Sequence, residues 1–202
     1  EIDVVRPGSS AERAGLHTGD ILLQVNGRDL SDSIDFMFHG NEPELDILLL
    51  RKGKKIPAKV SAGEGVDIGI ELKPFRIRQC NNKCIFCFVA QLPKGLRKSL
   101  YVRDEDYRAS FLYGNYIALT NLTVKDKKRI IEQRLSPLYL SVHSTNKAVR
   151  NTMIGNQKAG DVMKDLKFFK ENRIRMHTQI VLCSGYNDGK DLQKTIRDLY
   201  GL

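Results

Sequence analysis

The run Cys80-Asn81-Asn82-Lys83-Cys84-Ile85-Phe86-Cys87 places three of the four cysteines of this 202-residue chain within one short stretch. A disulfide framework would spread its cysteines so that the bridges close loops between distant segments. Three thiols packed this closely indicate ligands of a single metal centre instead. Such a centre needs reduced thiols, so we expect a reducing compartment, with the cytoplasm as the default location.

The spacing C-x3-C-x2-C suits a four-iron cluster better than zinc. Zinc takes four ligands, usually two C-x2-C pairs or cysteines with nearby histidines, whereas Cys183 is remote and the loop holds no histidine. A [4Fe–4S] cluster prefers thiolates, and three of them leave one iron open. That iron can chelate S-adenosylmethionine and pass an electron from an external donor into the sulfonium, which yields a 5′-deoxyadenosyl radical for hydrogen abstraction. A structural zinc site is the alternative.

Net charge and hydropathy indicate which kinds of partner the protein can bind. The formal net charge of +9 suggests an anionic partner, or else a solvated basic surface. No apolar run approaches the roughly 20 residues that a membrane helix needs, so we expect no membrane partner. A basic loop after the cysteines suggests phosphate or RNA, although acidic neighbours dilute it. Its basic residues are Lys94, Arg97, Lys98, Arg103 and Arg108.

The first half of the chain has the pattern of a small β-rich domain, residues 1–65. Short apolar runs at residues 2–5, 21–23, 45–50 and 56–60 predict strands, and glycine-containing turns separate them. Ser9 and Ser10 can cap a short helix over residues 11–14. The small-residue run 61–65 is the best linker candidate.

The second half, residues 66–202, alternates strands with helices, which favours βαβ units around a parallel sheet. This part of the chain is therefore predicted to be of the α/β class. The expected strands are residues 116–120, 138–143 and 176–182, and the expected helices are residues 124–134, 159–171 and 191–200.

Residues 7–16, 18–22 and 25–27 together resemble a PDZ domain of the bacterial protease type. The resemblance implies that an extended peptide binds by strand addition, with backbone amides holding its terminal carboxylate. The alternative is a structural or regulatory appendage. The glycine-containing carboxylate loop would lie before Ile2 or near Gly69-Ile70.

The whole chain resembles a bacterial family that joins an N-terminal PDZ-like domain to a radical S-adenosylmethionine (radical SAM) domain and whose substrate is unknown. The resemblance implies a partial (β/α) barrel, incomplete at its C-terminal end, with Cys80, Cys84 and Cys87 as ligands of a [4Fe–4S] cluster and S-adenosylmethionine as the second cofactor. The matching residues are 80–88, 91–93, 97–101, 106–108, 111–122, 135–139, 141–143, 177–183 and 185–189.

Polar residues near the expected strands are candidates for contact with cofactor or substrate. In such barrels the cofactor lies over the C-terminal ends of the strands, and polar side chains in buried parallel strands are unusual. The alternative is that these groups bond neighbouring backbone, and that Cys183 is a buried thiol. The candidate cofactor-binding residues are Gly114, Asn115, Ser141, His143 and Gln179, with His177 beside them.

Two classes of function follow. The first is an iron–sulfur oxidoreductase of the radical SAM type, acting on an unknown substrate. The second is a PDZ-type peptide-binding protein in which the iron–sulfur loop is structural or redox-sensing. An RNA-modifying enzyme is a weaker third reading, based on charge.

Overall fold

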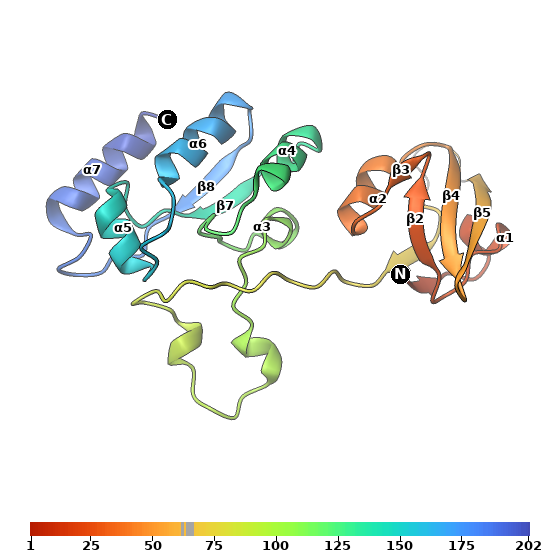
Figure 1. Cartoon of the computed structure of the whole chain (residues 1–202), viewed down its shortest axis with the longest axis horizontal. Coiled ribbons are helices and arrows are strands. Elements are labelled where there is room, and N and C mark those ends of the chain that lie inside the picture. Colours follow the sequence, from red (N-terminus) through yellow and green to blue (C-terminus); the bar gives the residue numbers. More distant parts are fainter. Residues whose placement is uncertain (62, 64–66) are drawn as a thin grey trace. The chain divides into compact units, whose positions relative to one another are not determined.

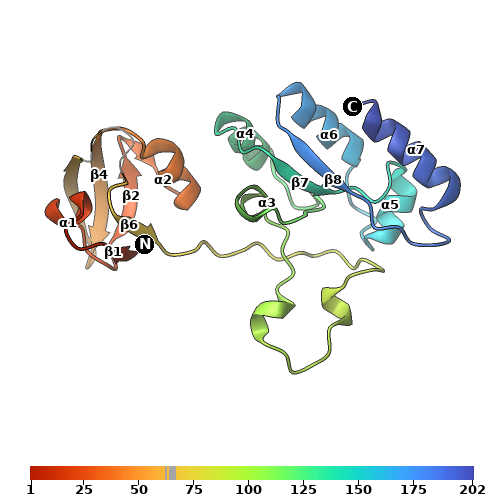
Figure 2. The ribbon, with the colours of Figure 1, turned by 180° about the vertical axis from the view of Figure 1, so that it is seen from behind.

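The computed structural model describes residues 1–61, 63 and 67–202. The chain divides into two compact units, Glu1–Arg76 and Ile77–Leu202, which are drawn in Figures 1 and 2. Each unit has its own secondary structure and is described by itself. Among the described residues, no helix combines the length and the apolar character needed to cross a bilayer.

The first unit is a small β-rich fold with two short helices. Four antiparallel strands form a sheet in the order β3-β2-β4-β5, and β1 pairs antiparallel with β6. The strands are β1 (Ile2–Val5), β2 (Ile21–Val25), β3 (Arg28–Asp29), β4 (Glu44–Arg51), β5 (Lys54–Ser61) and β6 (Ile70–Leu72), and the helices are α1 (Ser10–Arg13) and α2 (Ser33–His39).

Local sequence accounts for much of this unit. Asn26 and Gly27 have φ values of 49° and 73° and form the tight turn between β2 and β3, as two left-handed residues do in a two-residue hairpin. The Ser9 side chain accepts the N–H of Glu12 and so caps α1 as expected. Alternate residues of β4, among them Leu45 and Ile47, are buried. These side chains form the core together with Ile2, Leu16, Leu22, Val25, Leu49, Val60 and Ile68.

The boundary between the units lies later in the chain than the expected division at residue 65. Strand β6 follows that point and pairs with β1, with Val5 opposite Ile70, and this pairing makes residues 67–76 part of the first unit. Most of the expected linker, residues 61–65, falls outside the described residues.

The second unit is mixed α/β. Strands β7 and β8 are parallel and directly paired, and helices lie along them (Figures 1 and 2). The strands are β7 (Leu138–Ser141) and β8 (Met176–Gln179). The helices are α3 (Tyr107–Tyr113), α4 (Val124–Glu132), α5 (Lys147–Met153), α6 (Val162–Glu171) and α7 (Gly189–Tyr200), and two 3-10 turns, η1 (Val89–Gln91) and η2 (Lys98–Tyr101), precede them.

The alternation expected for this unit is confirmed, but all three expected strands are shorter than predicted, and β8 ends at Gln179 rather than at residue 182. Residues 116–120 make only a single parallel bridge, from Ile117 to Leu140, because Leu119 has a left-handed φ of 61° that ends the extended segment. Likewise β7 stops at Ser141, since His143 has a φ of 64°. The described residues form no closed barrel, and the partial barrel stays a prediction.

Candidate cysteine-loop site

The cysteine loop, residues 80–87, is held by backbone hydrogen bonds to two other segments. The Cys80 N–H donates to the carbonyl of Arg103 across 2.7 Å. On the other side, the N–H groups of Lys83 and Ile85 donate to the carbonyls of Ile154 and Met153, each across 2.9 Å. The end of α5 therefore supports the loop between its first and last cysteine.

The three thiols share a half-buried environment. Burial raises the pKa of Cys80. Burial and then the nearby charges of Cys80 and Cys87 raise the pKa of Cys84 to about 11. A half-buried thiol whose ionisation is opposed in this way suits a cationic metal centre, because the metal binds and stabilises the thiolate form. Within the described part of the chain, however, no three His, Cys, Asp or Glu side chains are gathered as ligands of a metal ion.

Asn82 is a buried polar residue inside the loop that sequence analysis missed. Its side chain is 1% exposed and uses both ends of its carboxamide. Its Nδ2 donates to Thr120 Oγ1 and its Oδ1 accepts from Asn156 Nδ2, each across 2.9 Å. The guanidinium of Arg103 donates to its backbone carbonyl.

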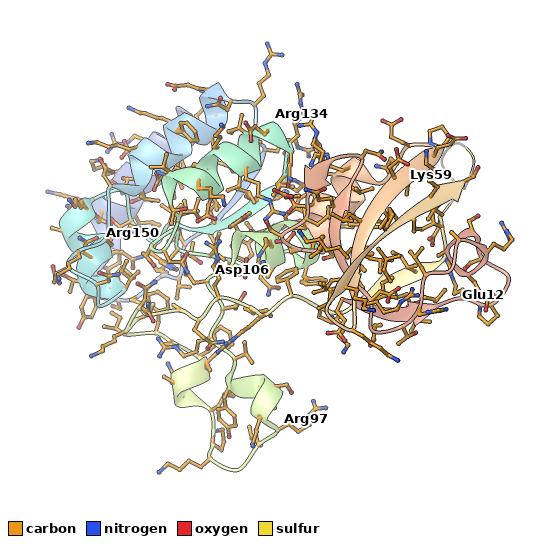
Figure 3. The ribbon with its side chains drawn as sticks, turned by 45° about the vertical axis from the view of Figure 1, so that its right-hand side comes forward. Glu12, Lys59, Arg97, Asp106, Arg134 and Arg150 are labelled. Carbon is orange, nitrogen blue, oxygen red and sulfur yellow. The ribbon has the colours of Figure 1, made fainter. Side chains whose placement is uncertain are left out.

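A buried charge pair also lies in this unit and was not predicted. Arg150 is 2% exposed and donates to three backbone carbonyls that follow the parallel segments: Ala118 at 2.7 Å, Val142 at 3.1 Å and Ser141 at 3.4 Å. It is labelled within the second unit in Figure 3. The carboxylate of Glu105, 3% exposed, accepts the N–H groups of Ala118 and Thr120.

These two residues carry opposite charges into the core. Burial raises the pKa of Glu105 and lowers that of Arg150, while each charge opposes the shift of the other. A sequence pattern could not reveal them, because a single Arg or Glu in a polar helix or loop normally indicates a solvated face.

His143 lies between the cysteine loop and the end of β8. Its ring contacts that of Phe86, with centroids 4.5 Å apart, and its Nδ1 accepts the N–H of Val181 across 3.2 Å. Burial lowers its pKa from 6.5 to about 4, so the imidazole is neutral at pH 7. The bond to Val181 agrees with the alternative interpretation, in which the side chain forms a hydrogen bond with neighbouring backbone.

The other predicted cofactor-binding residues occupy different settings. Ser141 and Gln179 are half-buried at the paired ends of β7 and β8. Gly114 ends α3 in a left-handed conformation, and a Cβ there would be 3.5 Å from the Tyr139 ring. Asn115 donates to Asp104 across 2.9 Å. Their roles as cofactor contacts stay predictions.

Aromatic rings line the accessible face of β7. Tyr139 stacks on His177, with centroids 4.7 Å apart and planes at 22°, and meets Tyr116 edge-on at 5.5 Å. His177 and Tyr116 are exposed. The stacked pair Tyr139 and His177 therefore lies on a side of β7 and β8 that solvent reaches.

Two residues of the basic loop bond to neighbouring groups, and three others are exposed to solvent. Arg103 bonds to Asn82, and Arg108 pairs with the buried Asp106. Lys94, Arg97 and Lys98 are exposed, and Arg97 extends outward from the loop in Figure 3. The exposure of these three cations is compatible with an anionic partner, and RNA binding stays a prediction.

Comparison with known proteins identifies both parts of the chain. A family model described as "Radical SAM-like domain" matches residues 62–202, which is more than half of the chain. The chain belongs to the radical SAM-like domain family. A second model, described as a PDZ domain, matches residues 1–38, so the chain is a fusion of the two kinds of domain.

The radical SAM-like domain contains every candidate site residue named above, from Cys80 to Gln179. Curated proteins give no match to the chain. Among solved structures, the chain is similar to the crystal structure of the HtrA3 PDZ domain bound to a phage-derived ligand (FGRWV), with 30% identity and a TM-score of 0.28. That similarity covers 29% of this chain and spans 58% of that chain.

Proposed function

We propose that the protein is a radical SAM enzyme that binds a [4Fe–4S] cluster through Cys80, Cys84 and Cys87 and acts on an unknown substrate. The observation that supports it is that three half-buried cysteines occupy one loop of a radical SAM-like domain, where burial raises the pKa of Cys80 and of Cys84. A thiol-only set of three matches an iron–sulfur cluster and falls short of the four ligands of structural zinc. The donor set therefore fits the group.

The bound [4Fe–4S] cluster would supply the chemistry of the reaction, and the protein would hold and shield it. With the cluster in place, its open iron would hold S-adenosylmethionine and supply the electron for reductive cleavage to a 5′-deoxyadenosyl radical, which abstracts a hydrogen atom from the substrate. The electron comes from an external donor. The protein's own residues hold the loop against α5 and shield it with Phe86, which limits access of water to the centre.

The end of the parallel sheet is the proposed place for the second cofactor. Ser141 and Gln179 end adjacent parallel strands, and ligands of open α/β sheets bind outside the carboxyl ends of strands. His143, buried and neutral, borders the same region. We assign Ser141, His143 and Gln179, with Gly114 and Asn115, to cofactor binding within a partial (β/α) barrel in the cytoplasm.

Anaerobic reconstitution tests this proposal. Wild type should bind about four irons and, once reduced with S-adenosylmethionine present, should produce 5′-deoxyadenosine. Cys84→Ala should do neither, whereas Cys183→Ala, which removes the thiol outside the loop, should do both. Tight binding of one zinc by wild type, with no nucleoside formed, would overturn the proposal.

A second candidate function belongs to the first unit. A groove of about 580 Å³ lies between α2 and β6, lined by apolar side chains that include Phe36, Met37, Ile68, Ile70 and Leu72. Strand β6 pairs with β1 along one edge, and an extended peptide added beside it would gain backbone hydrogen bonds and apolar pockets. The PDZ match supports peptide binding here, with the iron–sulfur loop then serving a structural or redox-sensing role.

Fluorescent peptides test this second candidate on the full chain. A pool with random apolar C-terminal residues and free carboxylates should bind, and the same pool with amidated ends should bind more weakly. Ile70→Glu should abolish binding, because it places a charge in the groove. Ile56→Glu is the comparison, since Ile56 is also partly buried but does not line the groove. Equal binding of the two pools would reject the candidate.

A further inference from the structure

Asn82 joins the cysteine loop to two segments that lie far away in the sequence. Thr120 is 38 residues and Asn156 is 74 residues from Asn82. Thr120 follows the bridged segment at Ile117, and Asn156 follows α5. Asn82 lies between Cys80 and Cys84 in the sequence. Because only short stretches of backbone separate it from the two cysteines, fixing Asn82 also restricts the positions of their thiols.

The two partners of Asn82 are themselves fixed. The N–H of Thr120 donates to the buried Glu105 carboxylate across 3.1 Å. The N–H of Asn156 donates to the carbonyl of Asn151 across 3.0 Å. Asn82 is therefore bonded to groups that already have defined positions, and it cannot move without breaking hydrogen bonds that are shielded from water.

Because Asn82 is buried, losing its hydrogen bonds should be costly. A carboxamide that is 1% exposed has lost its water partners, and removing it leaves the Thr120 hydroxyl and the Asn156 amide short of a partner. Ala at this position would also leave the space of a carboxamide unfilled. The loop would then lose its buried side-chain link to residues 120 and 156 and keep its backbone hydrogen bonds to Arg103, Met153 and Ile154.

We infer that Asn82 is a positioning residue, which fixes the cysteine loop relative to the C-terminal ends of the parallel segments. The inference rests on the proposed function, because it assigns to Asn82 the orientation of the thiols that would hold the cluster. A site held by locked neighbours keeps its ligand longer and in one geometry. The role assigned to Asn82 acts through the thiols, and no catalytic role is assigned to it.

The chain supplies a matched control beside it. Asn81 is the same residue type in the same loop, but it is exposed. Asn81→Ala should therefore leave the loop unchanged, whereas Asn82→Ala should loosen it. Thr120→Val is a second probe, because it removes the hydroxyl partner without altering any atom of the loop.

The first experiment measures cluster retention in reconstituted protein. Under a chelator, Asn82→Ala should lose its cluster absorbance about tenfold faster than wild type, a factor in keeping with the loss of a buried hydrogen bond, and Asn81→Ala should match wild type. Thr120→Val should fall between them, and the double variant should be no faster than Asn82→Ala, since both changes remove one interaction. The EPR spectrum of the reduced cluster should broaden in Asn82→Ala.

A second experiment uses the protein without metal, so that the two proposals fail separately. Hydrogen exchange at the N–H groups of Lys83 and Ile85 should be about tenfold faster in Asn82→Ala than in Asn81→Ala, provided that both keep the far-UV circular dichroism of wild type. Equal exchange in the two variants would overturn the inference, even if wild type binds iron. If wild type binds no iron but exchange differs, the proposed function fails and the positioning role stands.

Discussion

Gly155 lies against the backbone of Lys83, so that a Cβ at Gly155 would be 2.2 Å from the Lys83 carbonyl oxygen. The φ of Gly155 is 59°, a left-handed value that favours glycine. Gly155 lies at the point where the turn after α5 meets the cysteine loop. The close approach is possible only because this residue has no side chain.

Gly155→Ala should therefore disturb the loop. We expect a loss of about 2 kcal/mol in the free energy of unfolding, from backbone displacement and left-handed strain together, and a lower iron content after reconstitution. Urea titration and iron analysis check this. Gly160→Ala is the control, because a Cβ there meets no atom within 4 Å. Equal stability of the two variants would show that the turn relaxes freely.

Arg150→Met should be strongly destabilising. The methionine fills part of the space but leaves the carbonyls of Ala118, Ser141 and Val142 without their buried donor and leaves the Glu105 charge uncompensated. We expect a loss of about 3 kcal/mol. The exposed Arg175, changed to Met, should stay within about 0.5 kcal/mol of wild type. A loss below 1 kcal/mol for Arg150→Met, again by urea titration, would mean that water replaces the guanidinium.

His143 should make the second unit sensitive to mild acid. Its pKa is about 4 in the folded protein against an ordinary 6.5, so the unfolded chain binds the extra proton first. Stability is therefore full above pH 6.5 and falls as the pH drops from 6.5 to 4, by up to about 3 kcal/mol at about 1.4 kcal/mol per pKa unit.

The variant His143→Gln should lose most of this slope, whereas His177→Gln, which alters an exposed imidazole, should keep it. Urea titrations at half-unit steps between pH 7 and pH 4 measure the difference. Parallel slopes for wild type and His143→Gln would contradict the assignment to His143.

Asp126 should stabilise the protein at neutral pH and lose that effect in strong acid. Burial alone would raise its pKa, but hydrogen bonds that Arg78 and Thr123 donate to its carboxylate outweigh burial and lower the pKa from 3.8 to about 2. The contribution is therefore present above pH 3.8 and is lost as the pH falls towards 2.

Asp126→Asn should reduce the free energy of unfolding by about 2 kcal/mol at pH 7, and the gap to wild type should narrow below pH 4. Glu171→Gln, at an exposed position, is the control and should show no such gap. A gap that stays constant down to pH 2.5 in urea titrations would attribute the loss to the helix cap instead.

Sequence analysis could predict the elements whose cause is local. The apolar periods of α4, α6 and α7 (Val124–Glu132, Val162–Glu171 and Gly189–Tyr200) and the Asn26-Gly27 turn each depend on residues within one short window. Helices α2, α3 and α5 were missed. In α5, the polar residues that obscure its pattern include Arg150 and Asn151, which are both buried. One partner of Arg150, the carbonyl of Ala118, lies 32 residues away, and a short window carries no trace of it.

The sequence alone drew attention to the cysteine loop, whose role as a cluster site stays a prediction, but it did not reveal the residues that support the loop. Three cysteines at this close spacing indicate a metal centre, and the spacing can be read from the sequence without a structure. Asn82, Arg150 and Glu105 are of residue types that usually lie on the surface, and their partners give them a role. These partners are 38 and 74 residues away for Asn82, 8, 9 and 32 residues away for Arg150, and 13 and 15 residues away for Glu105. Strand alternation and the resemblance of residues 141–143 both suggested His143 as a cofactor contact, which stays a prediction, but neither could reveal its left-handed backbone or its bond to Val181.

The pairing of β1 with β6 sets an order of events during synthesis. Val5 meets Ile70, so a ribosome must release nearly the whole first unit before its N-terminal strand finds its neighbour, and closing so long a loop is slow compared with local folding. The cysteine loop emerges soon afterwards, while residues that support it, Thr120 and Asn156, are still being translated. The nascent thiols would therefore be exposed for a time with neither fold nor metal, and metal insertion should follow the completion of α5.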